Sequence, residues 1–530
     1  MNILVAEPMA EAGLNILRQP GWEVRISNPK EYLSCLPEAD ALLVRSAVKV
    51  TREVLEKAPR LRVIGRAGVG VDNVDLAAAT AAGVIVMNTP GGNAVSVAEH
   101  TFALILAMAR SIPQATASTK SGKWEKKKFL GNEIRGKVLG VVGLGSIGRE
   151  VVRRALAFDM RVLGNDPYIG QKVAGDLGIE VVELDRLFAE SDYISLHMAL
   201  TPETRGFISA AAIAKMKDGA RLVNCARGEL IDQDALAEAL RSGKLAGAAL
   251  DVFSPEPPPA GFKLFELDNV VATPHIAGST EEAQELVGVR IAEQVVDYLK
   301  NGVALNAVNM PALTPEQYRV ARPYMALAER LGSFAAQVAP GNPKTVRMVY
   351  YGKTAEGSTH LLRNAGLVGI LNRWLSRRAT LVNALQIASE RGLNVSEQHA
   401  HKAAHVDSIT VELETDAGVT AVEGALVLGR PRLLRVDGIA CETHLEGHLL
   451  FMKNQDVPGV IGHVGTVLGR NGVNIANFSL GRRDEPSKPG EPLEALAVVE
   501  TDGEVPEAVL AQLRENPAVR SARSVSIDHT

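Results

Sequence analysis

The sequence predicts an α/β protein of several domains, and three observations support that prediction. Short apolar runs alternate with helical patterns from the first residues to about residue 272, which is typical of parallel sheets covered by helices. A glycine-rich turn joins one apolar run to an amphipathic helix. After Pro315 the pattern becomes a mixed α/β region, and from about Leu449 the order of strands and helices predicts a small ferredoxin-like unit.

Length and composition limit the classes of protein to be considered. At 530 residues the chain is too long for one hydrophobic core, so we expect three or four domains. The net charge of -4, the pI of about 6.3 and the aromatic content of 4% argue against a nucleic-acid or membrane-surface binder. The three cysteines, Cys35, Cys225 and Cys441, cannot form a disulfide framework, which favours a reducing cytoplasm.

Neither a leader nor a membrane span is expected. The chain opens with a strand-like run, Met1–Ala6, in place of a charged leader followed by an apolar stretch. The longest apolar helix, Ala94–Ile112, contains Glu99, His100 and Arg110, so we expect it to be buried in a protein core.

The apolar runs form two sets of expected strands. The first set comprises Ile3–Ala6, Glu23–Ile26, Ala41–Val44, Val63–Gly65 and Val84–Met87, with helices between them such as Ala10–Arg18 and Asn73–Ala82. The second set comprises Val138–Val142, Met160–Gly164, Tyr193–Leu196, Arg221–Asn224, Ala246–Leu250 and Val270–Ala272, and the long helix Glu281–Lys300 follows it. This alternation predicts two parallel sheets.

The glycine-rich turn has the spacing of a dinucleotide-binding motif. After the apolar run Val138–Val142, the turn places Gly143, Gly145 and Gly148 in the order G-x-G-x-x-G before a helix. Gly143 permits a tight turn, Gly145 lets a pyrophosphate approach the backbone, and Gly148 lets the helix pack on the strand. The free amides of the helix N-terminus favour the phosphates. The glycines alone are a weak signal, but the strand, the helix and a following acid are all in place.

The acid that follows the next strand indicates which dinucleotide binds. Asp166 is expected to accept hydrogen bonds from ribose hydroxyls. Its negative charge repels a 2′-phosphate, which favours NAD over NADP as the cofactor. The alternative for Asp166 is a turn residue before Pro167.

Three charged residues follow strand-like runs of the second set, where strand ends line a ligand crevice. His275 is a candidate base, and Glu256 lies in a proline-rich loop from which it could raise the pKa of the imidazole and fix its tautomer. Arg227 is suited to hold a carboxylate through two parallel hydrogen bonds. Each residue has a structural alternative: a core histidine, a solvated loop acid or a surface arginine. Their joint placement favours a site for hydride transfer.

Five motifs give the chain a resemblance to a known family. They are Gly65–Asp75, the turn that begins at Gly143, Asn224–Gly228, Ala249–Phe253 and Thr273–Gly278. With these motifs the chain resembles the D-isomer-specific 2-hydroxyacid dehydrogenases, in the long form that carries an allosteric substrate-binding domain and an ACT domain. The resemblance implies an NAD-dependent dehydrogenase.

The resemblance also implies roles for individual residues. Arg227 matches the arginine that orients the substrate, and His275, paired with Glu256, matches the catalytic base. The residues that match positions beside the cofactor are Gly143, Gly145, Ser146, Ile147, Gly148, Asp166, Met198, Cys225, Ala226, Asp251, Ala277 and Gly278. No metal ion is implied.

The resemblance implies four domains. Residues 1–97 and 286–315 are expected to form a discontinuous substrate-binding domain, and residues 98–285 an NAD-binding Rossmann domain. Residues 316–446 resemble an allosteric substrate-binding domain, and residues 447–530 resemble an ACT domain. The expected fold class is therefore α/β, with two Rossmann-like doubly wound domains followed by a mixed α/β domain and a ferredoxin-like ACT domain.

The substrate that the resemblance implies is 3-phosphoglycerate, which has two anionic ends. We expect Arg227 and the amides near Val69 and Gly70 at its carboxylate, and Arg45 and Arg66 at its phosphate. The implied reaction is oxidation to 3-phosphohydroxypyruvate, the first step of the phosphorylated route to L-serine. A glyoxylate or hydroxypyruvate dehydrogenase, or a non-catalytic NAD-sensing protein of the same fold, is the alternative.

The C-terminal region resembles a regulatory module. Asn454, Asp456 and Asn474 match an amino-acid site of ACT domains, and the implied effector is L-serine acting as an end-product inhibitor. Turn formation before Pro458 is the alternative reading of the first two residues. The family also suggests a tetramer, in which the basic run Lys123–Lys128 borders a neighbouring subunit or is simply a solvated loop.

Overall fold

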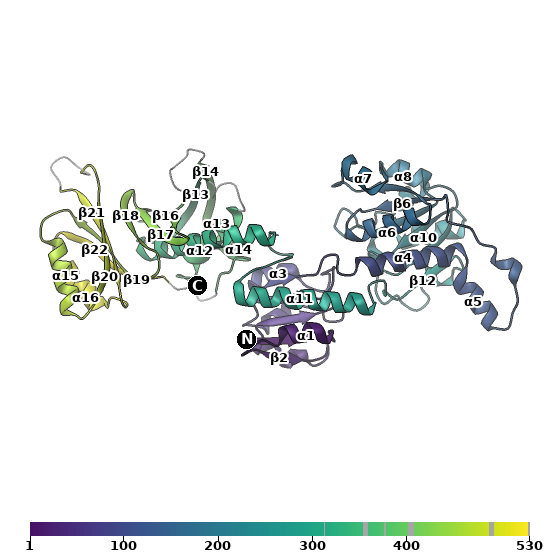
Figure 1. The fold of residues 1–530 in the computed structure, drawn as a ribbon, viewed down its shortest axis with the longest axis horizontal. Helices are drawn as coiled ribbons and strands as arrows, with labels where there is room; N and C mark the ends of the chain where they lie inside the picture. The colour runs from purple at the N-terminus through teal and green to yellow at the C-terminus, as the bar shows by residue number, and fades with distance from the viewer. Residues whose placement is uncertain (312, 353–358, 376–377, 401–406, 487–491, 528–530) are drawn as a thin grey trace.

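The computed structural model of the chain describes residues 1–311, 313–352, 359–375, 378–400, 407–486 and 492–527. Within these residues, four β-sheets with their helices follow one another along an elongated molecule (Figure 1). The sheet formed by the first strands of the chain lies between the second sheet, which is at one end, and the third. The C-terminal sheet lies at the other end. The expected fold class is confirmed.

The first sheet is parallel and has the order β2-β1-β3-β4-β5. Its strands are β1 (Asn2–Val5), β2 (Glu23–Ile26), β3 (Ala41–Val44), β4 (Val63–Arg66) and β5 (Ile85–Met87). Its helices are α1 (Glu11–Leu17), α2 (Arg52–Glu56), α3 (Leu76–Ala82) and α11 (Glu281–Asn301), which returns from the second domain. Helices α1 and α11 cross closely, because a Cβ at Gly13 would lie 2.7 Å from the carbonyl oxygen of Gly288.

The second sheet is also parallel, in the order β12-β11-β10-β9-β6-β7-β8. Its strands are β6 (Val138–Val142), β7 (Arg161–Asn165), β8 (Glu180–Val181), β9 (Tyr193–Leu196), β10 (Ala220–Asn224), β11 (Leu245–Leu250) and β12 (Val270–Ala272). Its helices are α6 (Ser146–Ala157), α7 (Gln171–Leu177), α8 (Leu184–Glu190), α9 (Ala210–Lys215) and α10 (Gln233–Arg241). The strand order reverses between β6 and β9, and doubly wound sheets bind ligands beside such a switch point.

The prediction of one helix over residues 94–112 is wrong at the C-terminal end of that range. The helix ends as α4 (Ala94–Ala109), and α5 (Ile112–Lys120) leaves it at an angle of 63°. Ser111 between them has φ 49°, and Pro113 lies in the first turn of α5, where a missing N–H is tolerated. In the part of the chain that the structure describes, no single helix is long and apolar enough to cross a membrane, although α4 and α5 taken together pass that test by length and composition.

The third and fourth sheets contain antiparallel strands. The third has the order β14-β13-β15-β16-β17-β18, from β13 (Pro343–Tyr351), β14 (Asn394–Ala400), β15 (Ser408–Thr415), β16 (Gly418–Val427), β17 (Arg430–Val436) and β18 (Ile439–His444). It packs with α12 (Pro315–Val338), α13 (Thr359–Leu371) and α14 (Ala384–Glu390). The fourth has the ferredoxin-like order β20-β21-β19-β22, from β19 (Gly447–Gln455), β20 (Ile475–Arg482), β21 (Glu494–Thr501) and β22 (Val519–Ile527), with α15 (Val460–Arg470) and α16 (Glu507–Arg514).

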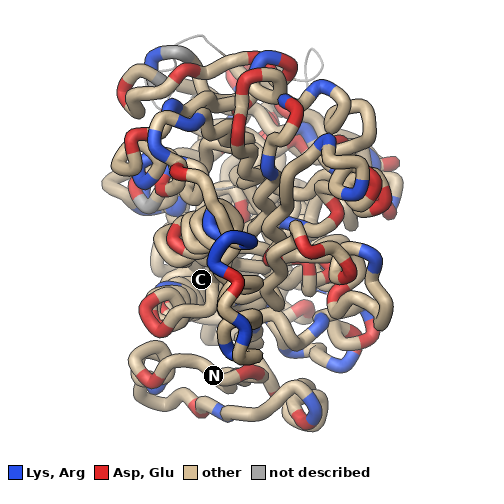
Figure 2. The backbone as a smooth tube through the Cα atoms, turned by 90° about the vertical axis from the view of Figure 1, so that its right-hand side faces the viewer, with Lys and Arg blue, Asp and Glu red and all other residues tan. Residues whose placement is uncertain are grey.

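Charge is distributed without a dominant sign. Basic and acidic residues are interspersed along the backbone in the view from the end that carries the second sheet (Figure 2). This distribution agrees with the small net charge of -4.

Candidate active site

The glycine turn leaves room for a pyrophosphate at the N-terminus of α6. Gly143 has φ 94°, and a Cβ there would lie 2.6 Å from the carbonyl oxygen of His197, at the end of the neighbouring strand β9. A Cβ at Gly148 would lie 2.0 Å from the Gly143 carbonyl oxygen, so the helix packs directly on the turn. In contrast, a Cβ at Gly145, the N-cap of α6, would meet nothing within 4 Å. The open space therefore lies where the amides of Ser146 and Ile147 begin the helix.

Asp166 is held beside this turn by backbone hydrogen bonds. Its Oδ2 accepts a hydrogen bond from the amide of Leu144 at 2.8 Å, and its Oδ1 accepts one from the amide of Tyr168 at 2.9 Å. Each carboxylate oxygen keeps a free lone pair, because an ionised carboxylate has about four acceptor positions. The end of β7 therefore presents a fixed carboxylate acceptor next to the phosphate space. Such an acceptor fits the ribose hydroxyls of a dinucleotide, which would donate to it.

His275 and Glu256 form a direct pair at the carboxyl ends of β12 and β11. The His275 Nδ1 and the Glu256 Oε2 lie 2.7 Å apart, and the Glu256 Oε1 accepts a hydrogen bond from the amide of Phe253 at 2.9 Å. A carboxylate cannot donate, so the proton between them belongs to Nδ1, which leaves Nε2 as the ring atom with a free lone pair. His275 has φ 55°, a left-handed conformation that is uncommon for a residue with a side chain.

Glu256 and His275 shift each other's pKa in opposite directions. The hydrogen bond and charge of Glu256 raise the pKa of His275, although burial opposes the shift. Burial pushes the pKa of Glu256 upward, but the hydrogen bonds from His275 and the Phe253 amide outweigh it and lower that pKa. Glu256 is therefore ionised at neutral pH, and the imidazole is a stronger base than a free histidine.

A second carboxylate, Asp251 at the end of β11, holds the loop that follows β12. Its Oδ1 accepts hydrogen bonds from the Thr273 hydroxyl at 2.6 Å and the Ile276 amide at 2.9 Å, and its Oδ2 accepts one from the Ala277 amide at 2.8 Å. Behind it, the His100 Nε2 lies 3.0 Å from the Thr273 hydroxyl oxygen. Asp251 is fully buried, and burial raises its pKa, but the nearby His100, whose Nε2 lies 3.4 Å from the Asp251 Oδ1, and the hydrogen bonds from Thr273, Ile276 and Ala277 lower it overall.

Arg227 reaches across to the first domain. Its Nε and Nη2 lie 2.9 and 2.7 Å from the Asp72 Oδ2, and its Nη1 donates to the carbonyl oxygen of Ala226 at 2.7 Å. The Asn224 side chain shapes the same turn by donating to the Arg227 carbonyl at 2.8 Å and accepting from the Ala226 amide at 2.9 Å. The guanidinium therefore lies where the carboxyl ends of the second sheet meet the loop after β4.

Arg66 and Gly70 lie close to this guanidinium. Burial, and after it the positive charge of Arg227, lower the pKa of Arg66 to about 10, which still leaves Arg66 protonated at neutral pH. A Cβ at Gly70 would lie 1.8 Å from the Arg227 Nη2. The backbone around Val69 and Gly70 thus borders the two guanidinium groups.

Arg45 lies in a neighbouring hollow. Its Nη1 donates to the carbonyl oxygen of Pro8 at 3.3 Å, and its backbone amide donates to the Glu7 carboxylate at 2.8 Å. The residues that line the hollow are Pro8, Met9, Ala10, Arg45, Ala67, Glu281, Gln284, Glu285 and Val287. Because Ala67 follows Arg66 directly, the hollow adjoins the loop after β4, and its other wall is the start of α11.

The remaining residues expected beside the cofactor have different degrees of burial. Cys225 is buried, and burial raises the pKa of its thiol to about 12, so the thiol is un-ionised at neutral pH. Met198 packs at the edge of the apolar core between the sheet and its helices. Ala277 is buried, and a Cβ at Gly278 would lie 2.8 Å from the Asn93 Nδ2, so little space separates this loop from the start of α4.

Sequence reasoning missed three residues of this site. Asp72 lies inside the motif Gly65–Asp75 but was given no role, and Thr273 lies inside the motif around His275. His100 was read only as evidence against a membrane span. The available signal was a lone histidine in an apolar helix, which needs a buried polar partner.

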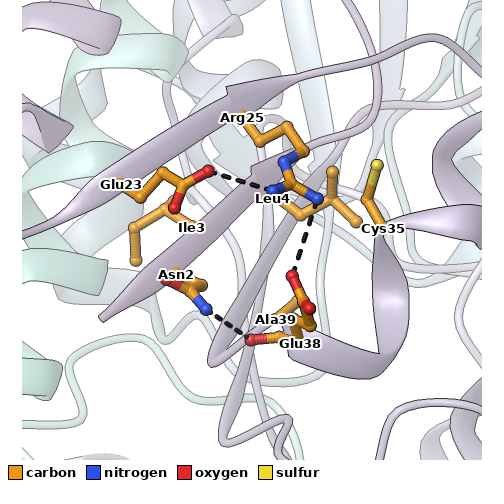
Figure 3. A pocket seen from close by; sticks show the side chains of 8 residues that line it. All are labelled: Asn2, Ile3, Leu4, Glu23, Arg25, Cys35, Glu38 and Ala39. Atoms are coloured by element: carbon orange, nitrogen blue, oxygen red, sulfur yellow. Dashed lines mark hydrogen bonds and ion pairs between the residues drawn. The ribbon is translucent and has the colours of Figure 1, made fainter.

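A small hollow at the other end of the first sheet does not belong to this site. It is lined by Asn2, Ile3, Leu4, Glu23, Arg25, Cys35, Glu38 and Ala39 (Figure 3). Asn2 and Glu23 begin their strands, whereas Arg45 and Arg66 lie at the carboxyl ends of β3 and β4. Arg25 is bracketed by Glu23 at 3.0 Å and Glu38 at 3.7 Å, so its charge is balanced locally.

The three expected effector residues do not form one cluster within the chain. The Asp456 Oδ2 pairs with Arg482 at 3.2 Å, whereas the Asn474 Nδ2 donates to Asp502 at 2.8 Å. Asn454 and Arg482 both lie level with Ala495 in the sheet, but Ile475, next to Asn474, lies level with Thr501. Thr501 pairs with His448, which lies six residues from Asn454 along β19. At about 3.3 Å per residue, Asn474 therefore lies roughly 20 Å from Asn454 and Asp456.

Family models match three regions of the chain. Residues 102–277 match the D-isomer specific 2-hydroxyacid dehydrogenase NAD binding domain, residues 320–437 match the D-3-phosphoglycerate dehydrogenase intervening domain, and residues 448–518 match the ACT domain. The chain is thus a D-isomer-specific 2-hydroxyacid dehydrogenase that uses NAD. The resemblance and the cofactor inferred from the sequence are confirmed.

Full-length relatives define the branch of that class. The chain is 44% identical to D-3-phosphoglycerate dehydrogenase of Methanocaldococcus jannaschii over 99% of this chain and 100% of the relative. It is 38% identical to the Bacillus subtilis enzyme of the same name, with 99% of each covered. The chain belongs to the D-3-phosphoglycerate dehydrogenase family.

Solved structures resemble somewhat more than half of the chain. The TT0316 protein of Thermus thermophilus has a TM-score of 0.54 and 38% identity, covering 58% of this chain and 100% of that one. An NAD-dependent formate dehydrogenase of Staphylococcus aureus, solved with NAD, has a TM-score of 0.52 and 31% identity, covering 57% of this chain and 97% of that one.

Proposed function

We propose that the protein oxidises 3-phosphoglycerate at C2 to 3-phosphohydroxypyruvate with NAD, as the first step of the phosphorylated route to L-serine. The observation that carries the proposal is that Arg227 and the His275–Glu256 pair follow strands of one parallel sheet and lie close enough for the charge of Arg227 to act on the pKa of His275. Full-length similarity to enzymes named for this reaction supports the same substrate.

In the proposed mechanism, His275 is the base. Glu256 holds the proton on Nδ1, so Nε2 accepts the proton of the C2 hydroxyl as the C2–H bond breaks. NAD held by the residues of the second domain would supply the hydride acceptor. The carboxylate of Glu256 stabilises the imidazolium that forms, and in the reverse direction the imidazolium returns the proton to the carbonyl oxygen of the substrate.

We assign the anionic ends of the substrate to the arginines. Arg227 has two N–H groups free of protein acceptors in the contacts described above, enough to hold the C1 carboxylate. Arg66, next to Arg227, and Arg45, in the adjoining hollow, are proposed to face the phosphate. Three guanidinium groups suit a substrate that carries both a carboxylate and a phosphate. They are less suited to a small hydroxy acid that has no second anionic group.

The residues proposed to hold NAD are those of the glycine turn, Asp166, and the stretch that includes Cys225, Ala226, Met198, Ala277 and Gly278. The open space at Gly145 would admit the pyrophosphate, and the Asp166 carboxylate would accept hydrogen bonds from the ribose hydroxyls. Asp251, whose side chain is fully buried, would act on the cofactor through the Ile276 and Ala277 amides that it holds in place.

We further propose that L-serine binds the ACT domain and that the protein is a cytoplasmic homotetramer. Asn454 and Asp456 lie at one end of the ACT sheet and Asn474 at the other, so an effector site that uses all three requires two copies of the chain. In the segment that follows α5, Trp124 and Leu130 are 85% and 91% exposed to solvent. Exposed apolar side chains of this size are suited to contact with another subunit. The three free cysteines are consistent with a reducing compartment.

The proposal is tested by following NADH with three hydroxy acids. We expect oxidation of 3-phosphoglycerate, much slower oxidation of D-glycerate and glycolate, and inhibition by L-serine. Preference for glycolate would identify a glyoxylate-type enzyme instead, and no turnover with any of the three would favour an NAD-sensing protein. Light scattering of the purified chain, and calorimetry with L-serine, test the tetramer and the effector separately.

A further inference from the structure

The substrate arginine has an acidic partner on the opposite domain. Asp72 lies in the loop after β4, and its Oδ2 contacts the Arg227 Nε at 2.9 Å and Nη2 at 2.7 Å. The Asp72 side chain is 61% exposed, whereas that of Arg227 is 28% exposed. The contact therefore joins the two domains through residues that are 155 positions apart in sequence.

The contacts of Arg227 leave one edge of the guanidinium available. A guanidinium carries five N–H groups in a planar fork. Asp72 takes the N–H of Nε and one N–H of Nη2, which together form the side edge, and the Ala226 carbonyl oxygen takes one N–H of Nη1. One N–H on Nη1 and one on Nη2 remain, and side by side they form an end edge that matches the two oxygens of a carboxylate.

The backbone beneath this pair is shaped to admit it. A Cβ at Gly70 would lie 1.8 Å from the Arg227 Nη2 and 2.9 Å from the Asp72 Oδ2. The ion pair thus passes directly over Gly70, two residues before Asp72. Any larger residue at position 70 would displace the pair, so the glycine and the acid act as one unit.

The charges of the pocket give the acid a second effect. The positive charge of Arg227 lowers the pKa of Arg66, and the negative charge of Asp72, which contacts Arg227 at 2.7 Å, acts in the opposite direction. Without Asp72 the repulsion between the two guanidinium groups would be unopposed by this acid, and Arg227 would lose the contact that fixes its orientation.

We propose that Asp72 is a positioning residue for the reaction, which holds the side edge of Arg227 from the opposite domain so that the end edge faces the substrate carboxylate. The inference deepens the proposed function and rests on it. Asp72 does not touch the reacting carbon in this account and acts through Arg227.

The test compares Asp72→Ala and Asp72→Asn with the wild-type enzyme. Asp72→Ala is expected to raise the KM for 3-phosphoglycerate and lower kcat, with kcat/KM falling about 10- to 100-fold, the usual effect of losing a hydrogen bond to a charged group. The KM for NAD is expected to stay unchanged. Asp72→Asn keeps an oxygen that can accept from Nε and Nη2, so it should recover part of the lost kcat/KM.

Two controls separate this inference from its alternatives. Asp218→Asn removes an exposed acid paired with Lys244 at 2.6 Å, before the start of β10, and is expected to leave both KM values unchanged. If Asp72 merely competes with the substrate for Arg227, Asp72→Ala will lower the KM for 3-phosphoglycerate, and the inference fails. An unchanged kcat/KM in Asp72→Ala also overturns it, whereas a wild-type enzyme inactive on 3-phosphoglycerate would overturn the proposed function itself.

Discussion

Two carboxylate–histidine pairs serve one loop of the active site, and they differ in exposure. Glu256 and His275 lie 2.7 Å apart, with side chains 36% and 51% exposed. Asp251 and His100 lie 3.4 Å apart, with side chains 0% and 18% exposed. The exposed pair is accessible from solvent, whereas the buried pair is enclosed by hydrogen bonds. We therefore expect the same residue types to serve proton transfer in one place and positioning in the other.

In both pairs the tautomer of the histidine is fixed by a neighbouring oxygen that can only accept a hydrogen bond. Because a carboxylate only accepts, Glu256 keeps the proton on the His275 Nδ1. The Thr273 hydroxyl gives its one proton to Asp251, so its oxygen must accept from the His100 Nε2. The Nε2 of His275 is therefore left to act as the proposed base, whereas the donating Nε2 of His100 is used inside the protein.

The buried pair supports the exposed one. The backbone amide of His275 donates to the Asp251 carbonyl oxygen at 2.8 Å, and the two amides that follow donate to the Asp251 carboxylate. These hydrogen bonds hold His275 at its left-handed φ of 55°. Positions of this kind persist only where the surroundings fix them, and they cluster at functional sites.

The largest effect is expected at the exposed histidine. His275→Asn removes the proposed base and should lower kcat by about 10²- to 10⁴-fold, the usual contribution of general base catalysis. His448→Asn in the fourth domain, which removes a contact with Ser526, should leave kcat unchanged. Steady-state assays in both directions give the measurement. Near-full turnover of His275→Asn would end the assignment of this pair to proton transfer.

The next effect is expected in stability, at the buried acid. Asp251→Ala leaves the Ile276 and Ala277 amides and the Thr273 hydroxyl without their acceptor, which should reduce the free energy of unfolding by roughly 2–4 kcal/mol. Denaturant unfolding followed by near-UV circular dichroism measures it. Asp234→Asn, at an exposed pair with Lys263, should leave the midpoint in place. Equal midpoints for the two variants would contradict a structural role for Asp251.

A smaller effect is expected from neutralising the exposed acid. Since Glu256 raises the pKa of His275 above its ordinary value of 6.5, oxidation should increase with pH through an inflection above that value, because only the neutral imidazole accepts a proton. Glu256→Gln should move the inflection to lower pH and reduce kcat about 10- to 100-fold. Profiles of kcat/KM against pH report the inflection of the free enzyme. An inflection that does not move would mean that Glu256 does not control the protonation of His275.

The parallel sheets were predictable because their strands are buried on both faces and appear as continuous apolar runs. Strand β8, only Glu180–Val181, is too short and too polar to stand out. The antiparallel strands of the third sheet depend on pairings that a local pattern does not specify. The break after Ala109 was missed because the apolar pattern continues across Ser111.

The site was predictable to the extent that chemistry accompanied a strand end. Arg227, Glu256 and His275 each follow a strand, and the strand order explains why they meet. Asp72 and His100 come from elements distant in sequence, and their roles depend on contacts made only after folding. Sequence pattern alone could not show that the effector residues lie at opposite ends of one sheet, because that separation follows from the register.

The smallest effect is expected at His100, and it tests the comparison most closely. His100→Phe keeps a ring in the helix but removes the donor to Thr273, so it should lower kcat only a few-fold, as expected for a net loss of about 1 kcal/mol. Its pH inflection should match that of the wild-type enzyme, because the proton on His275 is governed by Glu256. Thr273→Val, which removes the bridging hydroxyl, should match or exceed this loss. A shifted inflection in His100→Phe would show that the buried pair also controls the protonation of His275. The assignment of proton transfer to one pair and positioning to the other would then be wrong.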